Sequence, residues 1–281
     1  MLSCQNLTVS PSESPEPILY SASVAFKRGA MNAVIGPSGC GKTTLVKAML
    51  KIIPAEGKSF FAGEQIKSPD ELVGKVGFAP QFTCAHPLLT VEEAVGSALE
   101  IAGVPTEKRE ERLGEILETI GLAEHAKKLV GSLSGGQLRR IGLGVELAGD
   151  PAVMCCDEVT SGLDPLSENS ILDLLRNLCD SRGKTFVCII HNLAKLDYFD
   201  TVIHKGRVVF SGTPENLKKH FGIDSPLSLY DRLNELDVSE WLALRDDEQE
   251  SGADEACVDS GVASSLPKRA GTGFLRQLAM L

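Results

Sequence analysis

The fold of this chain is decided by a stretch that reads Gly36-Pro37-Ser38-Gly39-Cys40-Gly41-Lys42-Thr43-Thr44. An apolar run that ends at Ile35 precedes the stretch, and an apolar-periodic run that starts at Leu45 follows it. The pattern G-x-x-x-x-G-K-[ST] between a strand and a helix is typical of a phosphate-binding loop. Glycines allow the backbone to curl tightly, so its N–H groups face an anion that the helix dipole also attracts.

Two side chains of the loop carry chemistry of their own. Lys42 is predicted to reach the β- and γ-phosphates of a nucleotide from an exposed junction between loop and helix. The hydroxyl of Thr43 is placed to ligate Mg²⁺. The alternative is a glycine-rich turn that happens to end in Lys-Thr, and the strand-loop-helix context disfavours it.

Length and composition are typical of a globular enzyme, with 281 residues, of which 43% are hydrophobic and 23% charged. The net charge of −10 argues against a general nucleic-acid binder, because binding phosphates requires a basic face. No apolar run reaches about 18 residues, so we expect no membrane span, and the N-terminus does not resemble an export signal. The eight cysteines are scattered without paired spacing, which fits a reducing cytosol rather than a disulfide or metal site.

The hydrophobic pattern alternates between strands and helices along the chain. Strands are predicted at residues 2–9, 18–26 and 31–35, and the helix after the phosphate loop should run to about Ile53 and stop at Pro54. Residues 58–66 and 75–79 are expected to form a small sheet at the nucleotide's edge. Helices with charged faces follow over residues 90–129, and we interpret those faces as solvated.

A second candidate anion site is the segment Leu133-Ser134-Gly135-Gly136-Gln137, which opens a helix predicted to run through Leu147. A serine hydroxyl, exposed backbone N–H groups and the helix dipole can all face a phosphate there. Ser-Gly-Gly is also a common turn, so this segment taken alone is a weak signal.

Two further strands end in residues with candidate chemistry. The apolar run 152–156 ends in Asp157 and Glu158, and ligands of parallel sheets gather at such carboxyl ends. Asp157 is expected to hold Mg²⁺, and Glu158 to polarise an attacking water, although carboxylates at a strand end can also cap the next turn. The strand predicted at residues 185–190 delivers His191, which at this place can reach a γ-phosphate, whereas a lone histidine is more often structural.

In this order, the motifs resemble those of the nucleotide-binding domain of ABC transporters over about residues 2–221. The phosphate loop matches Walker A of that family, and residues 133–137 match its signature motif, which other phosphate-loop ATPases and kinases lack. The resemblance implies an α/β fold: a phosphate-loop NTPase core with a mixed sheet, an inserted α-helical subdomain and an N-terminal antiparallel β subdomain.

The resemblance also implies roles for the motif residues, with ATP and Mg²⁺ as cofactors. Glu158 and His191 look like the family's catalytic carboxylate and switch histidine, and Gln81 looks like its Q-loop glutamine. Thr43, Gln81 and Asp157 are then the metal ligands. The resemblance implies that ATP lies between residues 36–44 of one subunit and the signature of the other, with a D-loop residue nearby. The D-loop residue of this chain is Asp164. Its signature residues are Ser134, Gly135, Gly136 and Gln137.

The family's working unit is a head-to-tail dimer of ATPase domains, homodimeric or heterodimeric, which closes on ATP and powers a transmembrane permease. Finer features, such as Gly206-Arg207-Val208-Val209-Phe210-Ser211-Gly212, are similar to the G-type subfamily, where the permease domain follows in the same chain. The expected location is therefore the cytoplasmic face of a membrane, with no nucleic-acid partner.

Two positions depart from the family pattern. Val159 stands where a proline usually follows the Walker B glutamate, and we expect a looser turn there. No aromatic residue before Walker A is a clear adenine-stacking partner, because Tyr20 and Phe26 both fall in or beside predicted strands.

The predicted domain organisation has four parts. An ABC ATPase domain covers residues 1–222, with the helical subdomain at about 88–150. Short C-terminal helices at 223–245 are followed by a flexible acidic linker at 246–270, and residues 271–281 start a segment that leads to a membrane domain or docks on one.

Two other functions are alternatives to transport. A non-transport ABC ATPase that clamps a ribosome or DNA usually has tandem cassettes or a long coiled-coil insertion, whereas this chain has one cassette and about 90 residues between the two motifs. A nucleotide kinase would share Walker A but would explain neither the signature nor His191.

Overall fold

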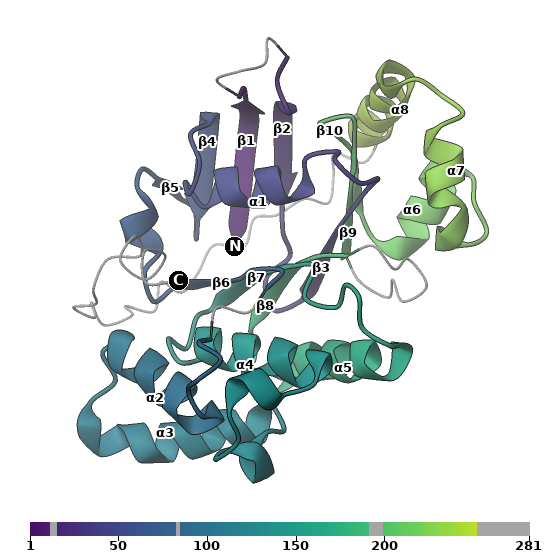
Figure 1. Ribbon diagram of the computed structural model, residues 1–281. Coiled ribbons are helices and arrows are strands. Elements are labelled where there is room, and N and C mark those ends of the chain that lie inside the picture. The colour runs from purple at the N-terminus through teal and green to yellow at the C-terminus, as the bar shows by residue number, and fades with distance from the viewer. Residues whose placement is uncertain (12–15, 83–84, 191–198, 252–281) are drawn as a thin grey trace.

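Two β-sheets and the helix between them form the upper part of the molecule (Figure 1). The computed structural model describes residues 1–11, 16–82, 85–190 and 199–251. The smaller sheet is antiparallel and four-stranded in the order β2-β1-β4-β5. Its strands are β1 (Leu2–Val9), β2 (Leu19–Ala25), β4 (Glu56–Phe61) and β5 (Glu64–Ile66).

The larger sheet has six strands in the order β10-β9-β3-β8-β7-β6 and is parallel except for β10. Every residue of β3, β6, β7 and β8 is buried, as expected for parallel strands covered on both faces. The strands of this sheet are β3 (Met31–Ile35), β6 (Val76–Ala79), β7 (Val153–Asp157), β8 (Thr185–Ile189), β9 (Phe199–His204) and β10 (Arg207–Gly212).

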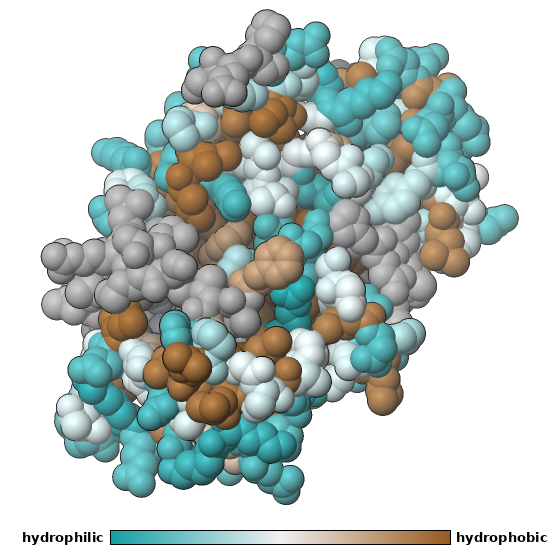
Figure 2. Space-filling model, viewed as in Figure 1, coloured by the Kyte–Doolittle hydropathy of each residue, from teal (hydrophilic) through white to brown (hydrophobic). Residues whose placement is uncertain are grey.

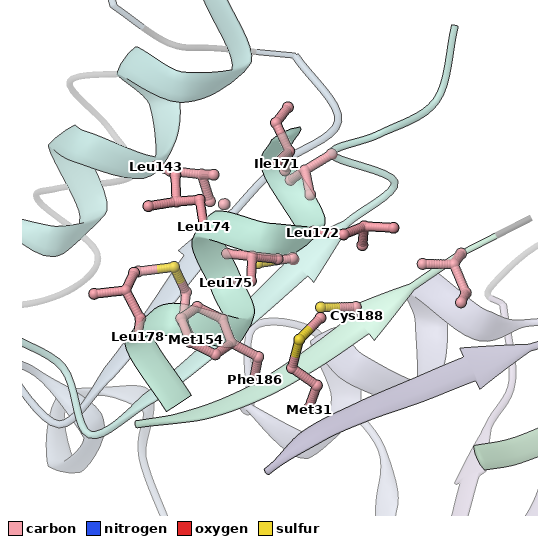
Figure 3. Close-up of a cluster of buried hydrophobic side chains, with 14 of the residues drawn as sticks. Met31, Leu143, Met154, Ile171, Leu172, Leu174, Leu175, Leu178, Phe186 and Cys188 are labelled. Carbon is pink, nitrogen blue, oxygen red and sulfur yellow. The ribbon is translucent and has the colours of Figure 1, made fainter. Parts of the chain in front are cut away.

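Helices cover the two faces of this sheet in two separate cores. On one face, Val34, Cys155 and Val187 pack with α1 (Lys42–Met49) and with the smaller sheet. On the other face, their strand neighbours pack under α4 (Gly135–Leu147) and α5 (Pro165–Arg182). Figure 3 shows Met31, Met154, Phe186 and Cys188 from that second face against leucines of the two helices. Because side chains alternate along a strand, α1 and α4 lie on opposite faces of the sheet.

The inserted helical subdomain enters the chain between β6 and β7. It contains α2 (Val91–Ile101), α3 (Thr106–Thr119) and α4, and forms the lower lobe of Figure 1 together with α5. The expected α/β class, the mixed sheet, the helical insertion and the antiparallel β subdomain are all confirmed.

Two predicted helices differ in extent. The helix α1 ends at Met49 rather than near Ile53, because the chain turns at Lys51 in a left-handed conformation with φ of 59°. A second helix is predicted over about residues 167–179, and α5 is longer: it ends at Arg182, where Gly183, another left-handed residue, caps it.

The expectation that residues 75–79 belong to the small sheet was wrong. Strand β6 pairs in parallel with β7, and Val76 lies opposite Val153. A fully buried strand needs cover on both faces, and only the large sheet supplies it.

The C-terminal helices pack on the core through aromatic residues. Trp241 of α8 (Val238–Ser251) is buried, with its ring centroid 4.8 Å from that of Phe221 at the end of α6 (Pro214–Phe221). A short helix, α7 (Leu229–Leu233), connects them. Helix α8 continues to Ser251, so the segment expected as a linker from residue 246 begins as helix; residues 252–281 lie outside the described part. Within the described residues, no helix combines the length and apolarity that spanning a membrane requires.

Candidate nucleotide site

The phosphate loop joins the carboxyl end of β3 to the start of α1. Gly36, Gly39 and Gly41 have φ values of 151°, 76° and 98°, which other residues rarely adopt. A Cβ at Gly36 would also lie 2.1 Å from the carbonyl oxygen of Ile203 on β9. The loop therefore requires glycine at Gly36 for space as well as for conformation.

The first turn of α1 is open to an anion. Its N-cap residue is Gly41, and no side chain caps the backbone N–H groups that start the helix. These groups and the helix dipole point at the space that the loop encloses, so the chain's own backbone fits a phosphate there.

Lys42 was expected to be exposed, and this expectation was wrong. Only 5% of the residue is exposed, and its Nζ donates to the carbonyl oxygens of Gly36 at 2.8 Å and Pro37 at 3.0 Å. The curl of the loop brings both carbonyls onto the ammonium, which sequence spacing alone does not indicate. The ammonium thus lies inside the loop, where it can neutralise bound phosphate.

Thr43 and Asp157 meet although they are far apart in the chain. The Oγ1 of Thr43 donates to Oδ1 of Asp157 at 2.9 Å. Burial raises the pKa of the Asp157 carboxyl, and the bond from Thr43 opposes this rise. Hydroxyl and carboxylate oxygens are the ligands that Mg²⁺ prefers, so this pair fits a magnesium ion next to the loop.

Gln81 and Glu158 form a second long-range pair. The Nε2 of Gln81 donates to Oε2 of Glu158 at 3.0 Å. Glu158 has a left-handed φ of 52°, outside the extended region that a following proline favours. Val159 is buried in the core under α4 and α5, so the turn without proline is well packed rather than loose.

Both aromatic candidates for adenine stacking already have protein neighbours at their rings. Phe26 is buried in the core between the two sheets. The ring of Tyr20 is covered by the guanidinium of Arg207, 4.7 Å from the ring centroid.

The signature segment starts α4, and its own side chains bond the first backbone N–H groups of the helix. The Oγ of Ser134 accepts from the backbone N–H of Gln137 at 3.4 Å, and the Gln137 side chain accepts from the N–H of Ser134 at 3.0 Å. Gly135 and Gly136 face Leu163 and Ser167 at the start of α5 rather than the phosphate loop. Because α4 and α1 cover opposite faces of the sheet, the signature and the loop do not enclose one common space within this chain.

Asp164 caps α5. Its Oδ1 accepts from the N–H groups of Leu166 and Ser167, both at 3.0 Å, and the Ser167 contacts are the main cause that lowers the pKa of this exposed carboxyl. Between this helix start and Glu158 lies an open hollow of about 230 Å³, lined by Glu158, Thr160, Ser161, Gly162, Leu163, Glu168, Ile189 and Ile190. His191 follows this hollow in sequence and lies outside the described residues.

One residue of this region was not anticipated. Glu146 of α4 accepts from the N–H of Phe78 at 3.1 Å, and burial raises the pKa of its carboxyl to about 7. The sequence placed it near the end of the helix predicted to run through Leu147, where a solvated carboxylate is the ordinary interpretation, so no local signal distinguished it.

Comparisons with known proteins agree with this geometry. The sequence profile described as ABC transporter matches residues 19–161. The methionine import ATP-binding protein MetN of Caulobacter vibrioides is 33% identical over 234 residues, which are 80% of this chain and 70% of that protein. MetN of Halalkalibacterium halodurans is 37% identical over 197 residues, and the chain spans 58% of its length. The ATP-binding/permease protein Rv1747 of Mycobacterium tuberculosis is 32% identical over 208 residues, 24% of its length.

Solved structures give the same result. The ATP-binding cassette MJ0796, as a dimer in a post-hydrolysis state with ADP and Pi, matches with a TM-score of 0.68 and 27% identity, over 76% of this chain and 98% of that one. CbiO1 of Clostridium perfringens, part of the transporter complex cbiONQ, matches with a TM-score of 0.72 and 25% identity, over 78% and 90%. The chain therefore belongs to the ABC transporter family, as an ATP-binding, ATP-hydrolysing cassette of the kind that powers transport.

Proposed function

We propose that the chain hydrolyses ATP with Glu158 as the carboxylate that orients and polarises water. Its Oε2 is held by Gln81 at the carboxyl end of the sheet that also carries the phosphate loop. The N–H groups of residues 36–44 and the ammonium of Lys42 bind the phosphates. His191, which directly follows the same sheet edge in sequence, contacts the γ-phosphate.

Thr43, Asp157 and Gln81 hold Mg²⁺ in this proposal. The observation that supports it is the Thr43–Asp157 bond, which brings two oxygen ligands from different elements to one place beside the loop. Bound there, the metal ion neutralises charge that develops on the phosphate oxygens.

The working unit is a head-to-tail dimer in which Ser134, Gly135, Gly136 and Gln137 of one subunit close over the nucleotide of the other. The opposite placement of α1 and α4 supports this, because one chain does not bring both anion sites to the same phosphate. The hydroxyl of Ser134 accepts from Gln137, which leaves its proton to donate to a phosphate. Asp164 fixes the start of α5 beside the signature glycines.

A transmembrane permease is the proposed partner, at the cytoplasmic face of a membrane. Exposed apolar side chains gather where the segment after Gln81 meets the helical subdomain: Phe82 is 71% exposed, Leu88 74% and Leu129 47%. Residue 90 bridges to Leu129, which places these segments side by side. Figure 2 shows apolar side chains on the face of this lobe around α2, as a docking surface would have.

The G-type arrangement, with the permease domain in the same full-length chain, remains part of this proposal. It is supported by the relative from M. tuberculosis, whose name combines ATP-binding and permease functions. The domain boundaries proposed above, including the ATPase domain at residues 1–222, follow the same arrangement.

The variant Glu158→Gln tests this function. The amide keeps the size of the side chain but loses the charge that polarises water, so turnover should fall by about 10² to 10⁴-fold. With ATP and Mg²⁺ the variant should elute as a dimer in size-exclusion chromatography. Adding Ser134→Arg in the same chain should prevent the dimer, because the bulky side chain blocks the place where the signature segment would bind the phosphate of the other subunit. Wild-type turnover in Glu158→Gln, or an unchanged dimer after the Ser134 substitution, would contradict the proposal.

A further inference from the structure

The signature helix α4 contacts the segment around Gln81 at two points, one on each side of that glutamine. Before it, the N–H of Phe78 donates to Oε2 of Glu146 at 3.1 Å. After it, the guanidinium of Arg139 lies over the ring of Phe82, 5.5 Å from the centroid. Gln81 is therefore bracketed by two contacts that both come from α4.

The two contacting side chains share one face of α4. Arg139 and Glu146 are seven positions apart, which is close to two full turns of an α-helix. Their common face is turned toward residues 78–82, and the helix joins the two contacts as one rigid body of 13 residues.

The contact at Glu146 is built closely into the sheet edge. Among the strands that the structure describes, β6 is the outermost of its sheet and pairs with β7 alone, and Glu146 accepts from one of its N–H groups. A Cβ at Gly77 would lie 3.2 Å from Oε2 of Glu146 and 3.2 Å from Cγ of Pro151, so glycine allows the helix to approach. Burial of this carboxyl opposes its ionisation and raises its pKa, which makes it an unusual choice for a purely structural position.

The segment so held reaches Glu158, the proposed catalytic carboxylate, through the side chain of Gln81. Gln81 follows β6 directly and donates to Glu158 at 3.0 Å. A shift of α4 would move Phe78 and Phe82 together, and Gln81 between them would change its position on Glu158.

We propose that Glu146 and Arg139 are positioning residues, which couple the signature end of α4 to Glu158 through Gln81. This inference rests on the proposed function, in which the N-terminus of α4 binds the nucleotide of a second subunit. When that terminus engages phosphate, the helix adjusts as a unit, and Gln81 sets the carboxylate for hydrolysis. Glu146 and Arg139 touch neither nucleotide nor water, so their effect should appear in the turnover rate and leave ATP affinity unchanged.

A double-mutant cycle between Glu146 and Gln81 tests the coupling. Glu146→Leu removes the acceptor, and kcat of the 281-residue chain should fall by about 10-fold to 100-fold, as misplaced catalytic groups do. Gln81→Ala should lower kcat by a similar factor. The double variant should be no slower than Gln81→Ala, because Glu146 acts through Gln81. ATP affinity, measured by titration, should stay within about two-fold of wild type in Glu146→Leu, because Glu146 does not touch the nucleotide.

Two further variants separate positioning from general damage. Glu146→Gln keeps an acceptor oxygen at the same place, so its kcat should remain within about three-fold of wild type. Glu110→Leu is the matched control, since Glu110 is exposed on α3, and it should leave kcat unchanged.

Arg139→Met, which keeps length and loses the cation, should cost about two- to five-fold in kcat. In a chain that already carries Gln81→Ala, Arg139→Met should cause no further fall in kcat. If Glu146→Leu does not fold, the cycle between Arg139→Met and Gln81→Ala decides.

The possible failures are distinguishable. Wild-type turnover in Gln81→Ala would overturn the proposed role of Gln81 and the coupling with it. A reduced rate in Gln81→Ala, combined with effects that multiply in the double variant, would leave the proposed function intact and overturn the coupling alone. Loss of ATP affinity in Glu146→Leu, in parallel with its turnover, would show a structural role and also overturn it.

Discussion

Two helix starts in the described part of the chain contain paired or clustered glycines, and they are built in opposite ways. At α1 the N-cap is Gly41, no side chain caps the helix, and the loop before it curls around the buried ammonium of Lys42. At α4 the side chains of Ser134 and Gln137 cap each other at the exposed end of the helix. The first start combines an uncapped helix end and a buried ammonium within one chain, and we propose it as a complete anion site. The second is a satisfied helix end, and in our proposal it becomes half of a site when another subunit brings a phosphate to it.

Matched glycine substitutions should separate the two helix starts most strongly. Gly36→Ala places a Cβ 2.1 Å from the carbonyl oxygen of Ile203 and should abolish ATP binding, with a loss of about 2–4 kcal/mol in the free energy of unfolding. At Gly135 the nearest atom to a Cβ is Cδ2 of Leu163 at 3.5 Å, and φ is not left-handed. Gly135→Ala should keep ATP binding to the monomer and gain up to about 1 kcal/mol from helix propensity. Nucleotide titration and urea denaturation measure both effects, and equal outcomes for the two variants would remove the distinction.

Lys42→Ala should affect both binding and stability. The variant loses the charge that we propose to hold phosphate, and it also leaves two carbonyl oxygens without their shared donor. We expect ATP affinity to fall by at least about 100-fold and the free energy of unfolding by about 1–3 kcal/mol. Lys58→Ala, at an exposed position on β4, is the control and should change neither. An unaltered denaturation midpoint for Lys42→Ala would show that the ammonium is not part of the folded loop.

Glu146, near the C-terminal end of α4, should make the free energy of unfolding depend on pH. The pKa of Glu146 is about 7 in the folded chain against an ordinary value of 4.5, so the folded state binds more protons than the unfolded state between these values. Stability should therefore fall as pH rises from about 4.5 to 7, by up to about 3 kcal/mol at 1.4 kcal/mol per unit, and level off above.

Glu146→Gln cannot ionise, so it should be more stable than wild type at pH 8, with the difference shrinking toward pH 5. Urea denaturation of both proteins at several pH values checks this. A stability difference that does not depend on pH would mean that Glu146 is ionised at its ordinary pKa.

Much of the site could be predicted from sequence because its parts are local patterns. The loop at Gly36–Thr43 and the carboxylates after β7 each require particular residue types at short spacing, and parallel strands bring their carboxyl ends to one edge. Such patterns predicted from the sequence alone that Thr43 and Asp157 serve one metal site. In the structure, Oγ1 of Thr43 lies 2.9 Å from Oδ1 of Asp157.

What could not be predicted depends on contacts between distant segments. Strand β6 has the same apolar pattern in either sheet, and pairing with β7, some 75 residues away, decides its place. The burial of Lys42 follows from the curl of its own loop. Glu146 has the spacing of a solvated helix residue, and the approach of Gly77 to α4 makes it a buried acceptor.

The central claim is that each ATP site takes its phosphate loop from one chain and its signature from another. Mixing two inactive chains tests it directly: one carries Lys42→Ala and the other Ser134→Arg. In a symmetric head-to-tail dimer, the mixed pair has one site with both defects and one site with neither. Each chain alone has a defect in every site.

The measurement is steady-state ATP hydrolysis of each chain alone and of the equimolar mixture. The account predicts that both single chains are inactive and that the mixture regains activity, which rises with the concentration of either partner. A mixture that stays as inactive as its components, although the two chains form mixed dimers in size-exclusion chromatography, would contradict the shared site and place both motifs on the same nucleotide within one chain.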